Sequence, residues 1–252
     1  VKCVIRRNDY GLDCTGTSSP VLKNSLVMDN RYSGIYCGSD STVTIENNWI
    51  YHNNGHGIWS GDAASPPLIR NNTIVDNANY GIKKEWGADP NISNCIIWGN
   101  TSGQLQNCTA MYSCIQNGGT SNGNINTDPL FYDDPNDPNN YHLSSESPCI
   151  DAGDPNFSDP NETDIDGEKR VIDGDANGTV IVDMGADEYY WSPADFDNSE
   201  NVDFFDYAMF ADNWRTTPND ANDYNDIFDL ADNNSIDYND LGLFCQDWLW
   251  EA

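Results

Sequence analysis

The chain has 252 residues, with 41 Asp or Glu against 11 Lys or Arg, and its formal net charge at pH 7 is -30. Such a charge repels nucleic acids and anionic membrane surfaces, so cations are the expected partners instead. The hydrophobic fraction of 38% is enough for a folded core, while no apolar run approaches the roughly 18 residues that span a bilayer.

A short sequence motif recurs four times in the first hundred residues, each time as a brief apolar run bounded by asparagine. The repeats begin at Asn24, Asn47, Asn71 and Asn94, so they step by 23, 24 and 23 residues. A period of this size, built from short alternating runs separated by Asn and Gly, indicates a solenoid of β-coils. A leucine-rich or helical solenoid is the alternative, but residues 1–117 contain neither a Leu-x-x-Leu-x-Leu run nor helical periodicity.

Three apolar columns run through the repeats and predict three short strands per coil. Because side chains alternate along a strand, each column should point inward and stack on its equivalents about 4.8 Å away. Asparagine suits the bends, since it tolerates left-handed backbone and its amide can bond to the amides above and below. The columns are Leu22, Ile45, Ile69 and Ile92; Val27, Ile50, Ile74 and Ile97; and Ile35, Ile58 and Ile82.

This pattern over residues 1–117 resembles the right-handed parallel β-helix superfamily, which includes pectate lyases, polysaccharide depolymerases and surface adhesins. The resemblance implies a mainly β protein with three parallel sheets. Residues 3–12 match the second half of a repeat, so we expect an N-terminally incomplete solenoid. Its open coil end would need covering by another chain, including a second copy of this one.

Outward positions after the repeat glycines carry aromatic and charged residues. Rings stack on pyranose C–H surfaces and charges fix the orientation of a sugar, so this face is a candidate for carbohydrate binding. Ordinary ladder packing of aromatics on a sheet is the alternative. The repeat brings no catalytic carboxylate pair or lyase base together, and we expect no catalytic residue. The candidate residues are Tyr36, Trp59, Lys83, Lys84, Glu85 and Trp86.

Eight cysteines occur without any Cys-x-x-Cys pair, and only three histidines accompany them. This argues against zinc, iron–sulfur and covalent haem sites. Cys14 and Cys37 both follow a repeat glycine by three residues, so they should be neighbours on adjacent coils. We expect either a disulfide, which would indicate an extracellular or periplasmic location, or two buried thiols. Cys95 with Cys108 or Cys114 is a second candidate pair.

The repeat decays after residue 117, and residues 118–191 carry a different set of motifs. Ser-Pro-Cys-Ile-Asp-Ala-Gly-Asp at 147–154 and Val-Asp-Met-Gly-Ala-Asp-Glu-Tyr at 182–189 resemble the choice-of-anchor Q module of bacterial surface proteins. The resemblance implies an irregular module that caps the last coil and connects to the cell. Asp173, Asp175 and Asn177 alternate before a glycine, which suits calcium, although a solvated acidic turn is the alternative.

Two similar acidic loops, at 195–206 and 229–240, lie 34 residues apart in segment 194–252, and each leads into an apolar stretch ending in Trp. Oxygen ligands at positions 1, 3, 5, 9 and 12, with a carbonyl at 7, describe an EF-hand-type calcium loop. Two such loop–helix units resemble a type I dockerin, which implies calcium and a cohesin-like scaffold as partners.

The resemblance assigns calcium ligands residue by residue. Ala231 occupies the third position of the second loop, so we expect a weaker second site, and calcium that only folds this small segment is the alternative to docking. The ligands in the first loop are Asp195, Asp197, Ser199, Asn201, Asp203 and Asp206, and those in the second are Asp229, Asn233, Ser235, Asp237 and Asp240.

Together these features predict a secreted, calcium-stabilised β-helix protein of a bacterial surface or matrix, with its signal peptide upstream of this sequence. Its expected role is structural, adhesive or carbohydrate-binding, and end-to-end assembly could proceed through the open coil. The alternative is the C-terminal part of a secreted polysaccharide lyase or glycoside hydrolase that carries a dockerin. The expected partners are calcium, a polysaccharide, a cohesin-like scaffold or another copy of the chain.

Overall fold

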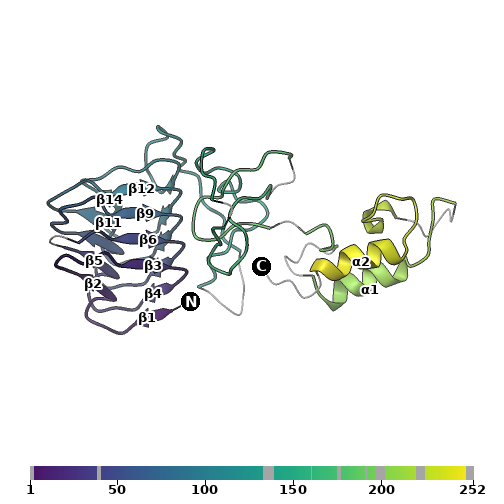
Figure 1. Ribbon diagram of the computed structural model, residues 1–252, viewed down its shortest axis with the longest axis horizontal. Coiled ribbons are helices and arrows are strands. Elements are labelled where there is room, and N and C mark those ends of the chain that lie inside the picture. The colour runs from purple at the N-terminus through teal and green to yellow at the C-terminus, as the bar shows by residue number, and fades with distance from the viewer. Residues whose placement is uncertain are drawn as a thin grey trace. The chain divides into compact units, whose positions relative to one another are not determined.

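The chain divides into two compact units, Val1–Tyr189 and Tyr190–Ala252, in a computed structural model of all 252 residues (Figure 1). Residues 118–189 belong to the same unit as the coils. The structure describes the chain except for residues 1–2, 39–40, 133–138, 160, 175–176, 191, 197–201, 220–224 and 248–252, and except for the side chains of 246 and 247.

Three parallel sheets form the solenoid, and each coil contributes one three- to five-residue strand to each sheet in its regular part. Sheet A contains β1 (Val4–Arg6), β4 (Leu26–Met28), β7 (Trp49–Tyr51), β10 (Thr73–Val75), β13 (Ile96–Trp98) and the two-residue β15 (Cys114–Ile115). Sheet B contains β2 (Leu12–Cys14), β5 (Ile35–Cys37), β8 (Ile58–Ser60), β11 (Tyr80–Lys84) and β14 (Gly103–Gln106). Sheet C contains β3 (Val21–Lys23), β6 (Thr44–Glu46), β9 (Leu68–Arg70) and β12 (Asn91–Ser93). The predicted mainly β, three-sheet parallel solenoid is confirmed.

The three apolar columns are the core of this solenoid. Ile69 pairs with Ile45 on one side and Ile92 on the other, and Ile50 and Ile58 occupy the same place in sheets A and B. These isoleucines are at most 2% exposed. Each isoleucine therefore packs against its equivalent in the neighbouring coil, as the alternation of side chains along the strands predicts.

Two different asparagine columns provide the left-handed bends and the amide ladder that the sequence predicts. Asn47 and its equivalents in the other repeats take left-handed backbone, with φ between 48° and 55°. A different column builds an amide ladder, in which Asn53 donates to Asn77 at 2.9 Å and Asn77 donates to Asn100 at 2.9 Å. The ladder continues through Gln104, which donates to Gln116 at 3.0 Å. Buried amides thus stay paired from coil to coil, as buried polar groups require.

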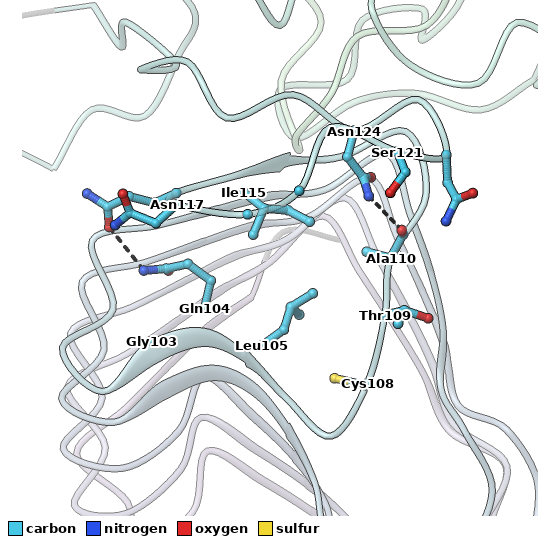
Figure 2. A pocket seen from close by; sticks show the side chains of 14 residues that line it. Gly103, Gln104, Leu105, Cys108, Thr109, Ala110, Ile115, Asn117, Ser121 and Asn124 are labelled. Carbon is cyan, nitrogen blue, oxygen red and sulfur yellow. Dashed lines mark hydrogen bonds between the residues drawn. The ribbon is translucent and has the colours of Figure 1, made fainter.

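Most of the middle segment lies along the outer face of sheet A rather than over the end of the solenoid. Trp49, Tyr51 and Val75 on that face pack against Tyr141 and Ile165 of the segment. The chain around residues 118–125 covers the end of the solenoid (Figure 2). A cavity of about 420 Å³ lies between this loop and the last coil. The expected module therefore flanks the strands, because the outer residues of sheet A are apolar and require cover.

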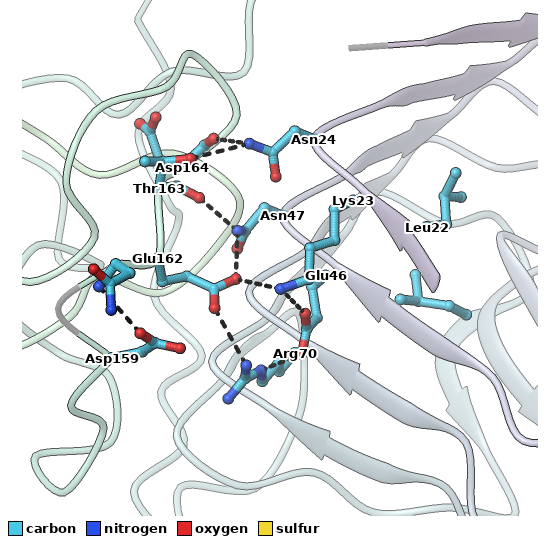
Figure 3. Close-up of polar contacts among 12 residues, drawn as sticks. Leu22, Lys23, Asn24, Glu46, Asn47, Arg70, Asp159, Glu162, Thr163 and Asp164 are labelled. Carbon is cyan, nitrogen blue, oxygen red and sulfur yellow. Dashed lines mark hydrogen bonds and ion pairs between the residues drawn. The ribbon is translucent and has the colours of Figure 1, made fainter. Parts of the chain in front are cut away.

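Ion pairs join sheet C to the middle segment (Figure 3). Glu46 pairs with both Lys23 and Arg70, its register neighbours in the coils on either side. Glu162 of the segment reaches the same two cations at 3.2 and 3.3 Å, and it accepts a hydrogen bond from the Asn47 amide at 3.0 Å. Both carboxylates are buried but have cationic partners, which offsets the cost of their desolvation.

The second unit contains α1 (Phe204–Asp212), a single 3-10 turn η1 (Asp226–Phe228) and α2 (Tyr238–Asp247). The Asp203 side chain caps α1, and the Asp206 side chain accepts a hydrogen bond from the Asp203 backbone N–H. The two contacts together form a capping box. The rings of Phe210 and Phe244 stack with their centroids 5.4 Å apart, so an aromatic contact joins the two helices. Within the described residues no helix is long and apolar enough to cross a membrane.

All eight cysteines lie in the described part of the chain and are free thiols. Cys14 and Cys37 are register neighbours, as expected, but the predicted disulfide between them is not formed. In-register parallel strands hold such side chains parallel at about 4.8 Å, whereas a disulfide needs Cβ atoms about 3.8 Å apart and suitably inclined. The alternative of two buried thiols is correct. The pairing of Cys95 with Cys108 or Cys114 is likewise absent.

Candidate glycan-binding face

One column of outward side chains runs across the strands of sheet B. Asp13 lies beside Tyr36, Tyr36 beside Trp59, and Trp59 beside Lys83 in consecutive register pairs. Tyr36 lies between Ile35 and a buried thiol, both of which point into the core, so its own side chain points out of the solenoid. The repeat thus places an acid, two aromatic rings and a base at steps of about one strand spacing, or 4.8 Å.

Two glycines hold the ring of Tyr36 against the sheet. A Cβ atom added at Gly38 or at Gly61 would lie 2.6 Å from the nearest ring carbon of Tyr36. The ring therefore covers the backbone of its own coil and of the next coil. It also meets the Trp59 ring edge-on, with centroids 4.9 Å apart. These contacts fix the orientation of both rings, which is the preorganisation that a binding surface needs.

Lys83 and Glu85 frame Trp59 with opposite charges. The indole Nε1 of Trp59 donates to Glu85 at 3.2 Å, and the Lys83 ammonium lies 5.4 Å from the centroid of the indole ring. Lys83 and Glu85 also pair with each other at 3.6 Å. The tryptophan is therefore held by a hydrogen bond and a cation–π contact, while both charged groups remain accessible to a ligand.

A second aromatic column, which the sequence analysis did not single out, flanks the first. The ring of Tyr10 lies 5.8 Å from that of Tyr36, and the ring of His56 lies 6.0 Å from that of Trp59. His56 stacks on Tyr80, and its Nδ1 accepts a hydrogen bond from the Tyr80 amide at 3.2 Å. Tyr10, His56 and Tyr80 each precede a repeat glycine, a shared position that could have revealed them.

Several carboxylates and the Lys83 ammonium shape the electrostatics of this face. Burial, then Asp62 and Asp13, raises the pKa of the Tyr36 hydroxyl. Burial and the charge of Lys83 lower the pKa of His56. Because Nδ1 of His56 accepts a hydrogen bond, its neutral tautomer carries the proton on Nε2. The face therefore offers neutral donors and several carboxylate acceptors around its rings.

The other predicted residues of this face lie at its border. Lys84 is the last residue of β11, and its ammonium pairs at 2.6 Å with Asp89 of the loop that follows. Trp86 is 71% exposed, and its amide donates to Gly61 in the previous coil at 2.7 Å. The structure thus brings Tyr36, Trp59, Lys83 and Glu85 together, with Lys84 and Trp86 beside them.

The predicted calcium ligands at the ends of the two acidic loops are buried aspartates that hold the loops closed. Asp206 accepts from the Phe196 amide at 2.7 Å and from the Asp203 amide at 2.8 Å. Asp240 accepts from the Ala231 amide at 2.8 Å and from the Asp237 amide at 2.6 Å. Each carboxylate therefore links the start of its loop to the start of the following helix.

The remaining predicted ligands differ in how far the structure describes them. Asp229 accepts from the amides of Asn233 and Asn234 at 3.0 and 2.7 Å, which curls the second loop. Asp173 accepts from the amides of Asn177 and Gly178 at 3.0 and 2.8 Å. Asp195 and Ser235 lie in the same two loops. The predicted ligands Asp175, Asp197, Ser199 and Asn201 lie outside the described residues.

The stacked sheets define the class of this protein as a parallel β-solenoid. The model of the family described as right handed beta helix region matches residues 1–127, which is half of the 252-residue chain. The chain belongs to that family. No curated protein and no solved structure matches it.

Proposed function

We propose that this chain is an extracellular β-helix protein that binds a polysaccharide along the outer face of sheet B. The observation that carries the proposal is the fixed pair of Tyr36 and Trp59 rings, one coil apart, with Lys83 and Glu85 around the indole. A polymer lying parallel to the solenoid axis would meet one ring in each of two neighbouring coils, Tyr36 and then Trp59. Its C–H surfaces would stack on the rings, while its hydroxyls would exchange hydrogen bonds with the charged groups.

The charges around the rings favour a neutral polymer. Asp13, Asp62 and Glu85 contribute carboxylates near Tyr36 and Trp59, while Lys83 is already paired with Glu85. The chain as a whole carries a net charge of -30. A polyuronate would be repelled by this surface at long range, whereas the hydroxyls of a neutral glycan can donate to its carboxylates.

A binding experiment tests this function. Affinity electrophoresis and calorimetry would compare a panel of neutral and acidic polysaccharides with wild type, Trp59→Ala and the control Phe205→Ala, which removes an exposed aromatic ring of the second unit. We expect binding of a neutral polymer that weakens about 30-fold in Trp59→Ala, since a central tryptophan commonly contributes about 2 kcal/mol. The control should bind as wild type does. Equal binding by all three proteins would refute the role of this face.

The same panel separates a binding protein from a polysaccharide lyase or glycoside hydrolase. We expect no soluble oligosaccharides by mass spectrometry after long incubation. Release of products that stops in Lys83→Ala or Glu85→Ala would instead identify an enzyme with these residues as its acid–base groups.

For the two C-terminal segments we propose attachment and calcium binding. The resemblance of residues 118–191 to choice-of-anchor Q supports a role in retaining the protein at a bacterial cell. The buried loop-closing aspartates, Asp206 and Asp240, support calcium loops of the dockerin kind. Calcium would be held by the loop oxygens, and the module would then dock on a cohesin-like scaffold. Calorimetry with calcium tests the first step, and Asp206→Asn should abolish the stronger site.

A further inference from the structure

A cluster of one histidine and two aspartates lies where the middle segment covers sheet A, and it shares no residue with the glycan-binding face or the acidic loops. The ring of His142 packs edge-on against that of Trp49, with centroids 5.0 Å apart. Its Nε2 lies 2.8 Å from Oδ2 of Asp166. One nitrogen of His142 and one carboxylate oxygen each of Asp166 and Asp187 all lie within 4.8 Å of one another.

The side-chain amide of Asn140 determines which ring nitrogen of His142 carries the proton when the imidazole is neutral. Oδ1 of Asn140 accepts from the backbone N–H of His142 at 2.9 Å, which is the role of an amide oxygen and not of an amide nitrogen. The same oxygen lies beside Nδ1 of the ring. Nδ1 therefore carries a proton, and in the neutral imidazole Nε2 is an acceptor. Two acceptors that face each other at 2.8 Å need either a proton or a metal cation between them.

Other contacts hold the two carboxylates in place. Asp187 is only 5% exposed, and its Oδ2 accepts from the Leu143 amide at 2.8 Å. Asp164 accepts from the amides of Asp166, Gly167 and Glu168, which fixes the turn that carries Asp166. Oriented ligands with hydrogen bonds to a second layer of groups are characteristic of metal sites. The Asp166 side chain is 25% exposed, which leaves a side open to solvent.

We propose that His142, Asp166 and Asp187 bind a divalent transition metal ion, for which zinc is the probe. One imidazole and two carboxylates are a donor set for such borderline ions, and water would complete the coordination. Metal–ligand distances of about 2.0–2.2 Å place ligand atoms about 3–3.5 Å apart. The exposed turn that carries Asp166 can make the small movement this requires, while His142 and Asp187 stay in place.

Such an ion would join parts of the middle segment that are distant in sequence. Its three ligands come from three places along the chain, and His142 also contacts Trp49 of β7. Binding to the folded state alone raises the free energy of unfolding. The site is distinct from the predicted calcium loops because it includes a nitrogen donor, which calcium does not favour.

Zinc titration in the presence of excess calcium tests the proposal, because calcium fills the sites made only of oxygen. Calorimetry and thermal unfolding would compare wild type, His142→Gln, Asp166→Asn and the control His56→Gln, with circular dichroism to verify folding. We expect one zinc site that stabilises wild type and the control, and that weakens at least about tenfold in both cluster variants. Cobalt should give an absorption band that requires His142.

Two results would overturn the proposal. One is zinc binding of equal strength in wild type, His142→Gln and Asp166→Asn. The other is no binding to wild type at about 1 mM zinc, which would leave a protonated imidazole paired with a carboxylate only. Asp166→Asn is isosteric and partly exposed, so it decides between these outcomes even where His142→Gln does not fold.

Discussion

The guanidinium of Arg170 lies 3.6 Å from the carboxylate of Glu188, and neither side chain has any exposure to solvent. Nη1 of Arg170 donates to the Asp187 carbonyl, and Nη2 donates to the carbonyls of Asp183 and Gly185, at 2.9 to 3.0 Å. One buried side chain thus closes the loop at residues 183–188, which carries Asp187 of the proposed metal cluster.

Replacing Arg170 by Met should destabilise the first unit by about 3–5 kcal/mol, because it leaves a buried carboxylate without its cation and three carbonyls without their donor. Denaturant unfolding measures the effect. Arg31→Met is the matched control, since its ion pair with Asp9 is 70% and 68% exposed and contributes about 1 kcal/mol or less. Equal losses in the two variants would contradict the assigned role of Arg170.

Removing one rung of the asparagine ladder should be costly for the solenoid. Asn77 accepts from the backbone and side chain of Asn53 and donates to Asn100, all in the interior. Asn77→Ala therefore leaves several buried groups unpaired at about 1–3 kcal/mol each. We expect a loss of at least about 3 kcal/mol by urea unfolding. Asn79→Ala, in an exposed contact with Ser102, should change stability by less than about 0.5 kcal/mol.

Gly38→Ala tests the preorganisation of the glycan-binding face without removing any of its rings. The new methyl group would collide with the Tyr36 ring, so the ring must leave its place against the sheet. We expect the affinity for a neutral polysaccharide to fall about tenfold while Trp59 and Lys83 remain in position. Gly242→Ala in α2 meets open space, and should leave affinity unchanged while stabilising the helix by about 1 kcal/mol. Unchanged affinity in both variants would count against the face.

Calcium removal should unfold the second unit and leave the solenoid folded. We expect EGTA to abolish the helices α1 and α2, because the first turn of each carries an aspartate, Asp206 or Asp240, that closes a predicted calcium loop, and to leave the three sheets intact. Limited proteolysis followed by mass spectrometry would then cut after residue 190 and spare the solenoid. Equal protease resistance of the second unit with and without EGTA would refute calcium-dependent folding.

His56 should stay neutral at pH values where an ordinary histidine is half protonated. Burial and Lys83 lower its pKa below about 6.5, so the stability it contributes is present above pH 6.5 and is lost as pH falls through the lowered value. An NMR titration should show a lower midpoint for His56 in the folded protein than in denaturant. Lys83→Met should move that midpoint upward, because it removes the second cause of the shift. An unchanged midpoint would contradict this electrostatic account.

The repeating half of the fold could be predicted from the sequence because its contacts are between equivalent positions. Ile45, Ile69 and Ile92 recur at a nearly constant period, and a parallel strand pairing converts that period directly into register. The same reasoning placed Tyr36 beside Trp59 on the outer face. Of the two alternatives for Cys14 and Cys37, the disulfide was wrong and the pair of buried thiols was correct. Neighbouring positions in register do not by themselves give two thiols the distance and inclination that a disulfide requires.

The non-repeating half depended on the tertiary structure. Nothing periodic links His142 to Asp166 or Asp187, which are 24 and 45 residues further along the chain. They meet because residues 118–189 fold over the apolar outer face of sheet A, a position set by the complementarity of side chains rather than by spacing. Periodicity in the sequence therefore determined the coils and one outer face, whereas only packing in three dimensions decided where the irregular segment lies and which of its donors meet.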